Sequence, residues 1–249
     1  MKVLVVLRAV VDAAQDLPLV DGQIDEDGVE LAPNEFDEYA LEEALHLKEV
    51  AGATVTVAAP AASGSRILHT ALARGADRAI RLDVELPLAG GSFALSAALR
   101  TVVADGGFDL VLTGVQAPDD VFGQLAPLLS ARLDWPQASG VGSVESAGAH
   151  TLTAIQELEG GRSVKLTLTL PAVLGVQTAR QAPRYVSATR LKQVMQTAAI
   201  DAAGGEAEGA AATLAAIAPP QSSGRVEMLS DDPDEAAGQI AAILMSQSA

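Results

Sequence analysis

The sequence predicts an α/β protein with a doubly wound, mostly parallel sheet, an antiparallel β addition and an extended C-terminal arm. Over residues 2–133, short apolar runs typical of buried strands alternate with segments of helical periodicity. This alternation favours parallel strands joined by right-handed crossovers. Further along, residues 152–158 and 162–170 are rich in β-forming residues, and the second run alternates apolar with polar side chains, as a strand with one wet face does.

Composition excludes several classes of protein. The chain has 249 residues, a formal net charge of −16 and no cysteine. The acidity argues against nucleic acid and anionic membranes as partners. Without an apolar run near the ~20 residues of a membrane span, no membrane insertion is expected. The lack of cysteine excludes disulfides and thiolate metal sites, and with no signal-peptide pattern it favours a cytoplasmic protein.

Four apolar runs are expected to form the parallel strands, and they lie at residues 2–7, 54–59, 78–82 and 110–113. Between the first strand and the first helix, the pairs Asp21-Gly22 and Asp27-Gly28 are turn signals. Leu19-Val20 and residues 29–31 are therefore expected to pair in a small hairpin.

Capping residues delimit the helices. Asn34 is expected to cap a helix that runs to about Val50, with Asp37 bonding back to it as in a capping box and Gly52 as the stop. Ser63 or Ser65 is expected to cap a second helix that ends near Arg74. A third helix is expected to open at residues 90–92 and to end near Asp105. The acidic side chains early in the first helix are interpreted as a solvated face rather than a metal site, and they are Glu35, Asp37, Glu38, Glu42 and Glu43.

The pattern of residues 110–137 predicts a strand, then a loop, and then a helix and its end. A polar loop follows Gly114, and apolar residues then recur with helical spacing at Val121, Leu125, Leu128, Leu129 and Leu133. Such a loop at the carboxyl end of a parallel strand is where open α/β sheets bind ligands, and the N–H groups of the helix start favour an anion. An ordinary βα connection remains the alternative.

Beyond residue 137, the two β-rich runs are expected to pair through Gly160-Gly161, and residues 172–176 are expected to add another strand. Residues 189–195 form a basic amphipathic stretch. Residues 198–220 are rich in Ala, Gly and Pro and are expected to be a linker. Residues 226–229 are expected to be strand-like and residues 233–245 helical.

Side chains that would support catalysis do not form a known arrangement. The three histidines, at positions 46, 69 and 150, have no local nucleophile or carboxylate signature, and neither a Walker loop nor a dinucleotide glycine fingerprint occurs. Asp119-Asp120 is interpreted as a contact to a ligand hydroxyl or as a loop cap rather than as a metal site. A nucleotide-dependent hydrolase is therefore disfavoured.

Several motifs resemble the β subunit of electron transfer flavoproteins. They are residues 114–120 (GVQAPDD) followed by 133–137 (LDWPQ), residues 34–38 (NEFDE), residues 70–78 (TALARGADR), and 171–173 (PAV) followed by 183–185 (PRY). The resemblance runs in order from Met1 to about Met195. It implies an electron carrier rather than an enzyme, with a fold of the adenine-nucleotide-binding type. Such a β subunit pairs with an α subunit that holds most of one FAD, and it shuttles electrons from a flavin-linked dehydrogenase to the respiratory chain.

The resemblance also implies a structural AMP bound by the β subunit, or a second FAD in some members. The residues that match the family's site are Val6, Asn34, Glu35, Phe36, Asp37, Ala59, Ala117, Pro118, Asp119, Asp120, Val121, Phe122, Gly123, Gln124, Leu125 and Ala126. One departure concerns the phosphate. The family usually has a threonine where this chain has Leu125, and Pro127 removes an N–H donor. Gly123 still permits a close backbone approach, and AMP is the expected ligand.

The family's recognition loop, which inserts a leucine into the dehydrogenase, aligns with residues 185–193. Ala188 stands at the leucine position, so the interpretation is a dedicated partner with a shallower pocket, such as one that oxidises an amine. The residues expected to dock it are Tyr185, Ala188, Arg190, Leu191 and Lys192, with Leu191 as substitute anchor.

Three regions are expected along the chain. Residues 1–183 form the nucleotide-binding α/β domain with its antiparallel addition, residues 184–197 the partner-recognition loop and helix, and residues 198–249 a linker and an arm that wraps the α subunit. The alternative function is a stand-alone adenine-nucleotide-binding sensor, for which the extension beyond residue 183 has no evident use.

Overall fold

The computed structural model describes residues 1–11, 19–20, 23–24, 29–84, 86, 91–120, 122–146, 148, 150–204, 218, 224, 226 and 228–246. The chain divides into two compact units, Met1–Ala216 and Ile217–Ala249. The first unit contains the sheet and five of the described α-helices, and the second contains one.

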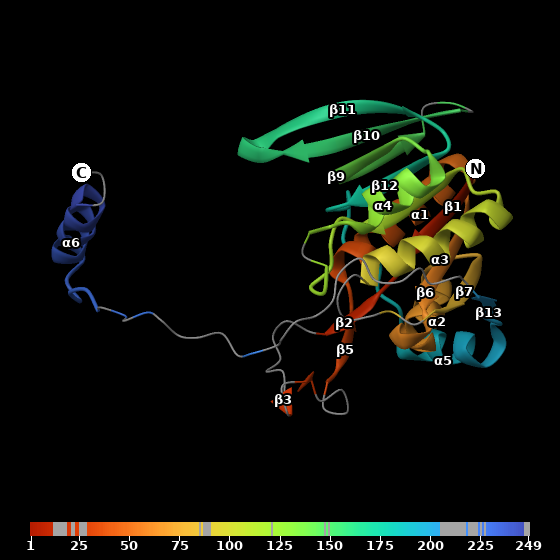
Figure 1. Ribbon diagram of the computed structural model, residues 1–249, viewed down its shortest axis with the longest axis horizontal. Coiled ribbons are helices and arrows are strands. Elements are labelled where there is room, and N and C mark those ends of the chain that lie inside the picture. The colour runs from red at the N-terminus through yellow and green to blue at the C-terminus, as the bar shows by residue number, and fades with distance from the viewer. Residues whose placement is uncertain are drawn as a thin grey trace. The chain divides into compact units, whose positions relative to one another are not determined.

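A nine-stranded sheet runs through the first unit in the order β11-β10-β9-β12-β8-β1-β6-β7-β13 (Figure 1). The parallel strands are β1 (Lys2–Val6), β6 (Thr54–Pro60), β7 (Arg78–Asp83), β8 (Leu110–Gly114), β12 (Ala172–Val176) and β13 (Asp201–Gly204). Strands β9 (Gln137–Ser146), β10 (Thr151–Leu158) and β11 (Arg162–Thr169) form an antiparallel extension, which joins the rest through a parallel pairing of β9 with β12. The doubly wound sheet with an antiparallel addition is confirmed.

Helices cover both faces of the sheet and bury two apolar clusters. On one face α1 (Glu35–Ala51) and α2 (Ser65–Arg74) pack on side chains such as Val3, Val5 and Leu112. On the other, α3 (Gly91–Gly106) and α4 (Leu125–Leu133) pack on Leu4 and Val6. Side chains that alternate along β1 thus point into opposite clusters, as the period of a strand requires. The short helices η2 (Ala61–Ser63) and η3 (Glu159–Gly161) lie in connections, and α5 (Ala188–Thr197) packs against α2.

The helix boundaries agree with the sequence, but some capping contacts differ. Gly52 ends α1 in the left-handed conformation, with φ of 65°, as predicted. Asn34 is the N-cap residue but its side chain makes no capping bond, and Asp37 bonds to other groups, so the predicted capping box is wrong. Neither predicted serine caps α2. Gly64 holds that position, and Ser63 Oγ instead accepts a bond from the N–H of Ala9 at 3.0 Å.

Two elements depart from the sequence pattern in the middle of the chain. Helix α4 begins at Leu125, later than the apolar spacing from Val121 suggested, because Gly123 adopts a φ of 61° that a helix cannot contain. Strand β9 was not predicted, since its sequence, QASGVGSVES, has small residues in place of an apolar alternation. Its pairing with β10 and β12 on either side makes it a strand.

Small strands near the N-terminus pair differently from the expectation. Strand β3 (Leu19–Val20) pairs with β4 (Gln23–Ile24). Strand β5 (Leu31–Pro33) pairs instead with β2 (Ala9–Val11), which directly follows β1. The expected pairing of Leu19-Val20 with residues 29–31 is therefore wrong.

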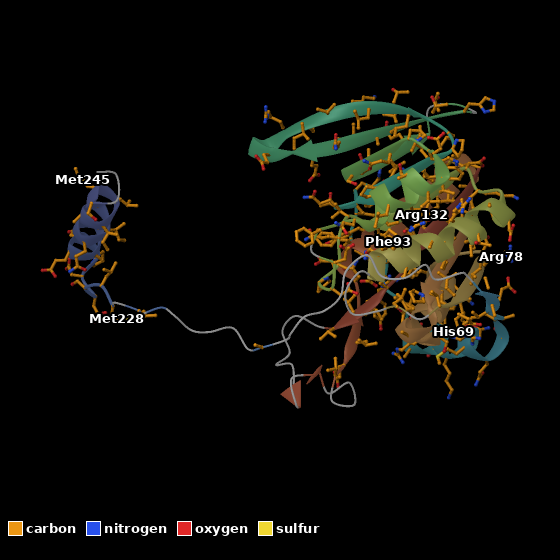
Figure 2. The ribbon with its side chains drawn as sticks, viewed as in Figure 1. His69, Arg78, Phe93, Arg132, Met228 and Met245 are labelled. Atoms are coloured by element: carbon orange, nitrogen blue, oxygen red, sulfur yellow. The ribbon has the colours of Figure 1, made fainter. Side chains whose placement is uncertain are left out.

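The predicted linker 198–220 is partly structured, because β13 pairs in parallel with β7 and ends the sheet. Most of its remainder, residues 205–217 and 219–220, lies outside the described residues. In the second unit, α6 (Pro233–Ser246) is helical as expected, whereas the described residues among 226–229 belong to no strand. Exposed apolar side chains are frequent in this unit, and Figure 2 labels two of them, Met228 and Met245.

Candidate functional site

A cavity of about 370 Å³ lies at the carboxyl ends of the parallel strands. Its walls come from β2 and β5, from the end of β6 with η2, from the first turn of α3, and from the loop after β8. The lining residues are Arg8, Ala9, Val10, Val11, Val29, Leu31, Pro60, Ala62, Ser63, Leu86, Gly91, Ser92, Leu95 and Asp119. The volume lies within the range of about 300–1,000 Å³ that is usual for small-molecule sites.

Asp37 ties together the three elements beside this cavity. Its carboxylate accepts bonds from the N–H of Arg8 at 2.8 Å, from Arg8 Nε at 3.1 Å and Nη2 at 3.0 Å, and from the N–H of Gly114 at 2.8 Å. Asp37 is 1% exposed and Arg8 5%. Gly114 permits this approach, because a Cβ there would collide with the Asp37 carboxylate and the backbone of α1. Asp37 therefore fixes the ends of β1 and β8 against the start of α1.

Asn34 extends this network to the loop after β8. Its N–H donates to the carbonyl of Arg8 at 2.9 Å, and its Nδ2 donates to the carbonyl of Gln116 at 2.9 Å. The guanidinium of Arg8 also reaches the carbonyl of Gln116, at 3.4 Å. The side chains of Asn34 and Asp37 are thus engaged with protein groups and hold the backbone of the site.

The loop after β8 is closed by Asp120. Ala117 and Asp120 exchange backbone bonds across a turn made by Pro118 and Asp119. One carboxylate oxygen of Asp120 accepts from Ser92 Oγ at 2.5 Å and from the N–H of Gln124 at 3.1 Å. Asp120 therefore acts as a loop cap, one of the two roles that the sequence left open for this pair.

Gly123 lets the loop turn into α4. Its φ is 61°, and a Cβ at this position would collide with the carbonyl oxygen of Val115. Only glycine meets both requirements without strain. Leu125 and Ala126, which follow, are each 1% exposed and belong to the apolar cluster under α3 and α4. At these two positions only the backbone can contribute to binding.

Helices α3 and α4 are fastened to each other beside the cavity. Arg132 of α4 donates from Nε to Ser96 Oγ at 2.9 Å, and its guanidinium carbon lies 4.5 Å from the centre of the Phe93 ring (Figure 2). A cation above an aromatic face is an attractive arrangement. Together with the contact between Ser92 and Asp120, it fixes the first turn of α3, whose Gly91 and Ser92 face the cavity.

The predicted site residues occupy different positions around the carboxyl edge. Asp119 lines the cavity directly. Val6, Ala59 and Ala117 are buried, whereas Glu35, Pro118, Phe122 and Gln124 are exposed, with Phe122 at 84%. Phe36, Asp120 and Gly123 are half-buried, and Val121 lies outside the described residues. The structure therefore brings these segments to one edge of the sheet but leaves several of the side chains out of the cavity.

Sequence reasoning missed three polar residues of the cavity, namely Arg8, Ser63 and Ser92. Each follows a parallel strand or opens a helix, so the rule that ligands bind at the carboxyl ends of strands would have pointed to them. The Ser63 hydroxyl accepts from Ala9, so its own hydrogen can point to a ligand. Gly91 and Ser92 present the N-terminus of the 16-residue helix α3, which favours an anion.

Burial and neighbouring charges shift the pKa values of Arg8 and Asp119. Burial by itself lowers the pKa of Arg8, but the charge and hydrogen bonds of Asp37 outweigh it and the pKa is raised, so Arg8 is a permanent cation. Asp119 is exposed, but its pKa is raised because desolvation of its carboxyl and the nearby carboxylates of Asp120 and Asp37 outweigh the attraction of Arg8 and a backbone hydrogen bond. A ligand hydroxyl that donates a hydrogen bond to Asp119 would stabilise its charged form.

The acidic residues of α1 are not the solvated face that the sequence suggested. Glu42 and Glu43 are 1% and 0% exposed. Glu42 accepts bonds from Gln181 and Arg184, and Glu43 accepts from the N–H groups of Val144 at 2.8 Å and Arg180 at 3.0 Å. That interpretation is therefore wrong for Asp37, Glu42 and Glu43, whose partners come from distant segments. In the described part of the chain, no group of three or more potential ligands could hold a metal ion.

The residues expected to dock a partner surround the start of α5. Tyr185 is 88% exposed, Ala188, Arg190 and Lys192 are exposed, and Leu191 is half-buried. Ser187 caps the helix by accepting from the N–H of Arg190 at 3.2 Å. None of the described helices has the length and the apolar composition that a membrane span requires.

The chain is an α/β protein with a cavity at the carboxyl edge of its parallel strands, and comparison with known proteins identifies its family. The electron transfer flavoprotein domain matches residues 21–218. The electron transfer flavoprotein subunit beta of Bacillus subtilis (strain 168) is 30% identical, over 99% of this chain and 98% of its own length. That of Syntrophomonas wolfei is 32% identical, over 97% and 94%. The human one is 33% identical, over 75% of each chain.

The chain therefore belongs to the electron transfer flavoprotein family, among its beta subunits. The family is named for electron transfer, and the chain is accordingly a subunit of an electron carrier, as its motifs implied.

Proposed function

We propose that this chain pairs with an electron transfer flavoprotein α subunit, and that the heterodimer carries one FAD held mainly by α. The heterodimer accepts electrons from a flavin-linked dehydrogenase and passes them to the respiratory chain. Family membership and the match to beta subunits along nearly the whole chain support this role. The exposed apolar side chains of α6 support the pairing, since Ile240, Ile243 and Leu244 lie at helical spacing on one face.

The cavity is the observation that supports a nucleotide in this subunit. Its apolar walls suit a planar base, and its few polar groups gather at the strand ends and the start of α3. These features fit a ligand with an apolar ring and a small anionic end, so we assign it a structural AMP. The bound nucleotide would stabilise the heterodimer by binding the folded state.

The site residues divide by the atoms they can offer. Asn34 and Asp37 position the backbone, since their side chains bond to protein groups. The hydroxyl of Ser63 and the N–H groups at the start of α3 are suited to the phosphate. Asp119 is suited to a ribose hydroxyl, because a carboxylate accepts hydrogen bonds. Of the described residues among 117–126, Asp119 lines the cavity, and the threonine that is usual in the family is replaced by Leu125.

Denaturing the purified heterodimer and identifying the released nucleotides by mass spectrometry tests this assignment. AMP at about one per heterodimer is expected. Two FAD per heterodimer would mean that a second flavin, and not AMP, occupies this subunit. One FAD with no further nucleotide would contradict a nucleotide site in this subunit. A Ser63→Ala variant should reduce the AMP content with the FAD content unchanged, because FAD is held by the partner.

The parts beyond the α/β domain are proposed to serve partners. Residues 184–197 dock the dehydrogenase through Tyr185 and the cationic Arg190 and Lys192, and residues 198–249 are the linker and arm that wrap the α subunit. The alternative is a stand-alone adenine-nucleotide sensor, which the cavity alone would suit because residues 8–119 supply its lining. Stable, nucleotide-responsive behaviour of the chain without an α subunit would favour the sensor.

A further inference from the structure

The segment after β12 is held to α1 by two adjacent buried glutamates. Glu42 accepts from Gln181 Nε2 at 2.6 Å, from the N–H of Arg184 at 3.1 Å, and from Arg184 Nε at 3.0 Å and Nη2 at 2.7 Å. The remaining side of the Arg184 guanidinium donates to Glu49 at 2.7 Å. Arg184 is therefore bound through its backbone and through its whole fork, a geometry that fixes orientation as well as position.

Glu43 makes similar contacts with β9 and with the residues just after β12. Its carboxylate accepts from the N–H of Val144 in β9 and from the N–H of Arg180, and Arg180 Nη2 donates to the carbonyl of Val144 at 3.0 Å. These bonds join α1 to β9 and to the residues just after β12. Glu42 instead binds Arg184, which lies four residues after Arg180 and immediately before the exposed Tyr185.

Residues 184–204, which we call the strap, are anchored at both ends. Arg184 fixes the first end on α1, and at the other end β13 pairs with β7 and Arg78 binds Asp201 at 2.6 Å. Between these anchors α5 packs on α2 and buries mainly Val194. Tyr185 directly follows the first anchor and is 88% exposed.

The exposed face of the strap has the chemistry of a docking surface. Residues 185–197 carry two basic side chains, those of Arg190 and Lys192, and no acidic one, in a chain whose net charge is −16. The exposed aromatic side chain of Tyr185, on the same segment as the exposed cations Arg190 and Lys192, fits a partner with a pocket that is rimmed by carboxylates. Holding such a surface in one conformation before binding lowers the entropy lost on association.

We propose that Glu42 is a positioning residue for docking: its ion pair with Arg184 holds the start of the strap so that Tyr185 and the cations of α5 form a preorganised surface for an acidic partner. This inference rests on the proposed function, in which the segment docks the donor dehydrogenase. Glu42 itself touches neither partner nor cofactor, and it acts through Arg184.

The matched pair of variants is Glu42→Gln and Glu43→Gln, both in the assembled heterodimer. Each removes one buried charge from the same turn of α1, but only the first releases the strap. The Michaelis constant for the donor dehydrogenase should rise about tenfold in Glu42→Gln, with the saturating rate and the flavin content unchanged. The reason is that the strap would then become ordered only when the dehydrogenase binds, which increases the entropy lost on association. Hydrogen exchange should accelerate in residues 185–192 of the same variant. Glu43→Gln should leave both quantities within about twofold.

An equal rise in the Michaelis constant for both variants, or none in Glu42→Gln, would overturn the inference. If Glu42→Gln does not assemble, Arg184→Lys tests the same contact, because lysine keeps the charge but loses the fork, and an intermediate rise is expected. Tyr185→Ala separates this inference from the proposed function. Unchanged kinetics in Tyr185→Ala together with faster exchange in Glu42→Gln would refute docking at this surface, whereas an effect of Tyr185→Ala alone would refute the positioning role of Glu42.

Discussion

The carboxylate of Asp37 accepts four hydrogen bonds, and three of them come from Arg8, a residue 29 positions earlier in the chain. Both side chains are buried at the carboxyl edge of the sheet, beside the cavity. The pair holds β1, β8 and the start of α1 in register. The geometry of the cavity therefore depends on an ion pair between two side chains of the protein itself.

Asp37→Ala should lower the free energy of unfolding by about 3–5 kcal/mol, because it leaves the Arg8 cation buried without its partner. Urea denaturation followed by circular dichroism measures the change. Asp105→Ala is the control, since Asp105 is an exposed acid near the end of α3, and it should change the free energy by less than about 0.5 kcal/mol. Equal effects of the two substitutions would contradict the structural role of Asp37.

Gly123→Ala should cost more stability than Gly160→Ala, although both glycines have a left-handed φ, of 61° and 70°. A Cβ at Gly160 meets open space, whereas one at Gly123 collides with the carbonyl of Val115. We expect about 1 kcal/mol for Gly160→Ala and at least about 2 kcal/mol for Gly123→Ala, with a lower AMP content only in the latter. Thermal unfolding and nucleotide analysis measure both. Similar costs and full AMP content in both variants would show that the close approach is unimportant.

Acid should release the strap through Glu42. Burial raises the pKa of Glu42, but hydrogen bonds from Arg184 and Gln181 outweigh it and lower the pKa below its ordinary value of 4.5. A carboxylate with a lowered folded-state pKa stabilises the fold above that ordinary value and loses its contribution as the pH falls through the folded-state pKa. The free energy of unfolding should therefore decrease as the pH falls below about 4.5, and this decrease should be less steep in Glu42→Gln. Identical pH profiles for the two proteins would contradict this linkage.

Docking should respond to charge at the start of α5. Ala188→Asp places a carboxylate among the exposed cations Arg190 and Lys192 and should slow electron transfer from the cognate dehydrogenase, with the flavin content unchanged. Leu191→Ala should have a smaller effect, because Leu191 is half-buried and presents little surface to a partner. Stopped-flow absorbance of the flavin measures both rates. Wild-type rates in both variants would show that this segment does not dock.

The sequence was sufficient to predict the doubly wound core, because apolar runs such as 110–113 and stops such as Gly52 are local signals. It could not predict β9, whose strand conformation depends on its neighbours, or β13, which lies in an Ala- and Gly-rich stretch. The same limitation applied to Glu42 and Glu43. On a helix they look like solvent-facing charges, and only the folded chain brings Arg180 and Arg184 to them.

The site was predicted in part for a similar reason. The carboxyl ends of β1, β6 and β8 were located correctly, since the rule for parallel sheets needs only the strand order. Ser63 and Ser92 were not predicted to line the cavity. The sequence pattern suggested a helix cap for Ser63 and a helix start for Ser92, whereas both residues line the cavity in the fold. Leu125 shows the reverse case: its side chain belongs to the core and not to the ligand.

Co-expression with the α subunit, followed by native mass spectrometry and flavin spectroscopy, is the decisive test of the proposed heterodimer. We expect a complex of one chain of each kind with one FAD, which is reduced by the cognate dehydrogenase, and a flavin-free, self-associating β chain when it is expressed alone. A stable monomer of this chain that binds one FAD by itself and is reduced without an α subunit would contradict it.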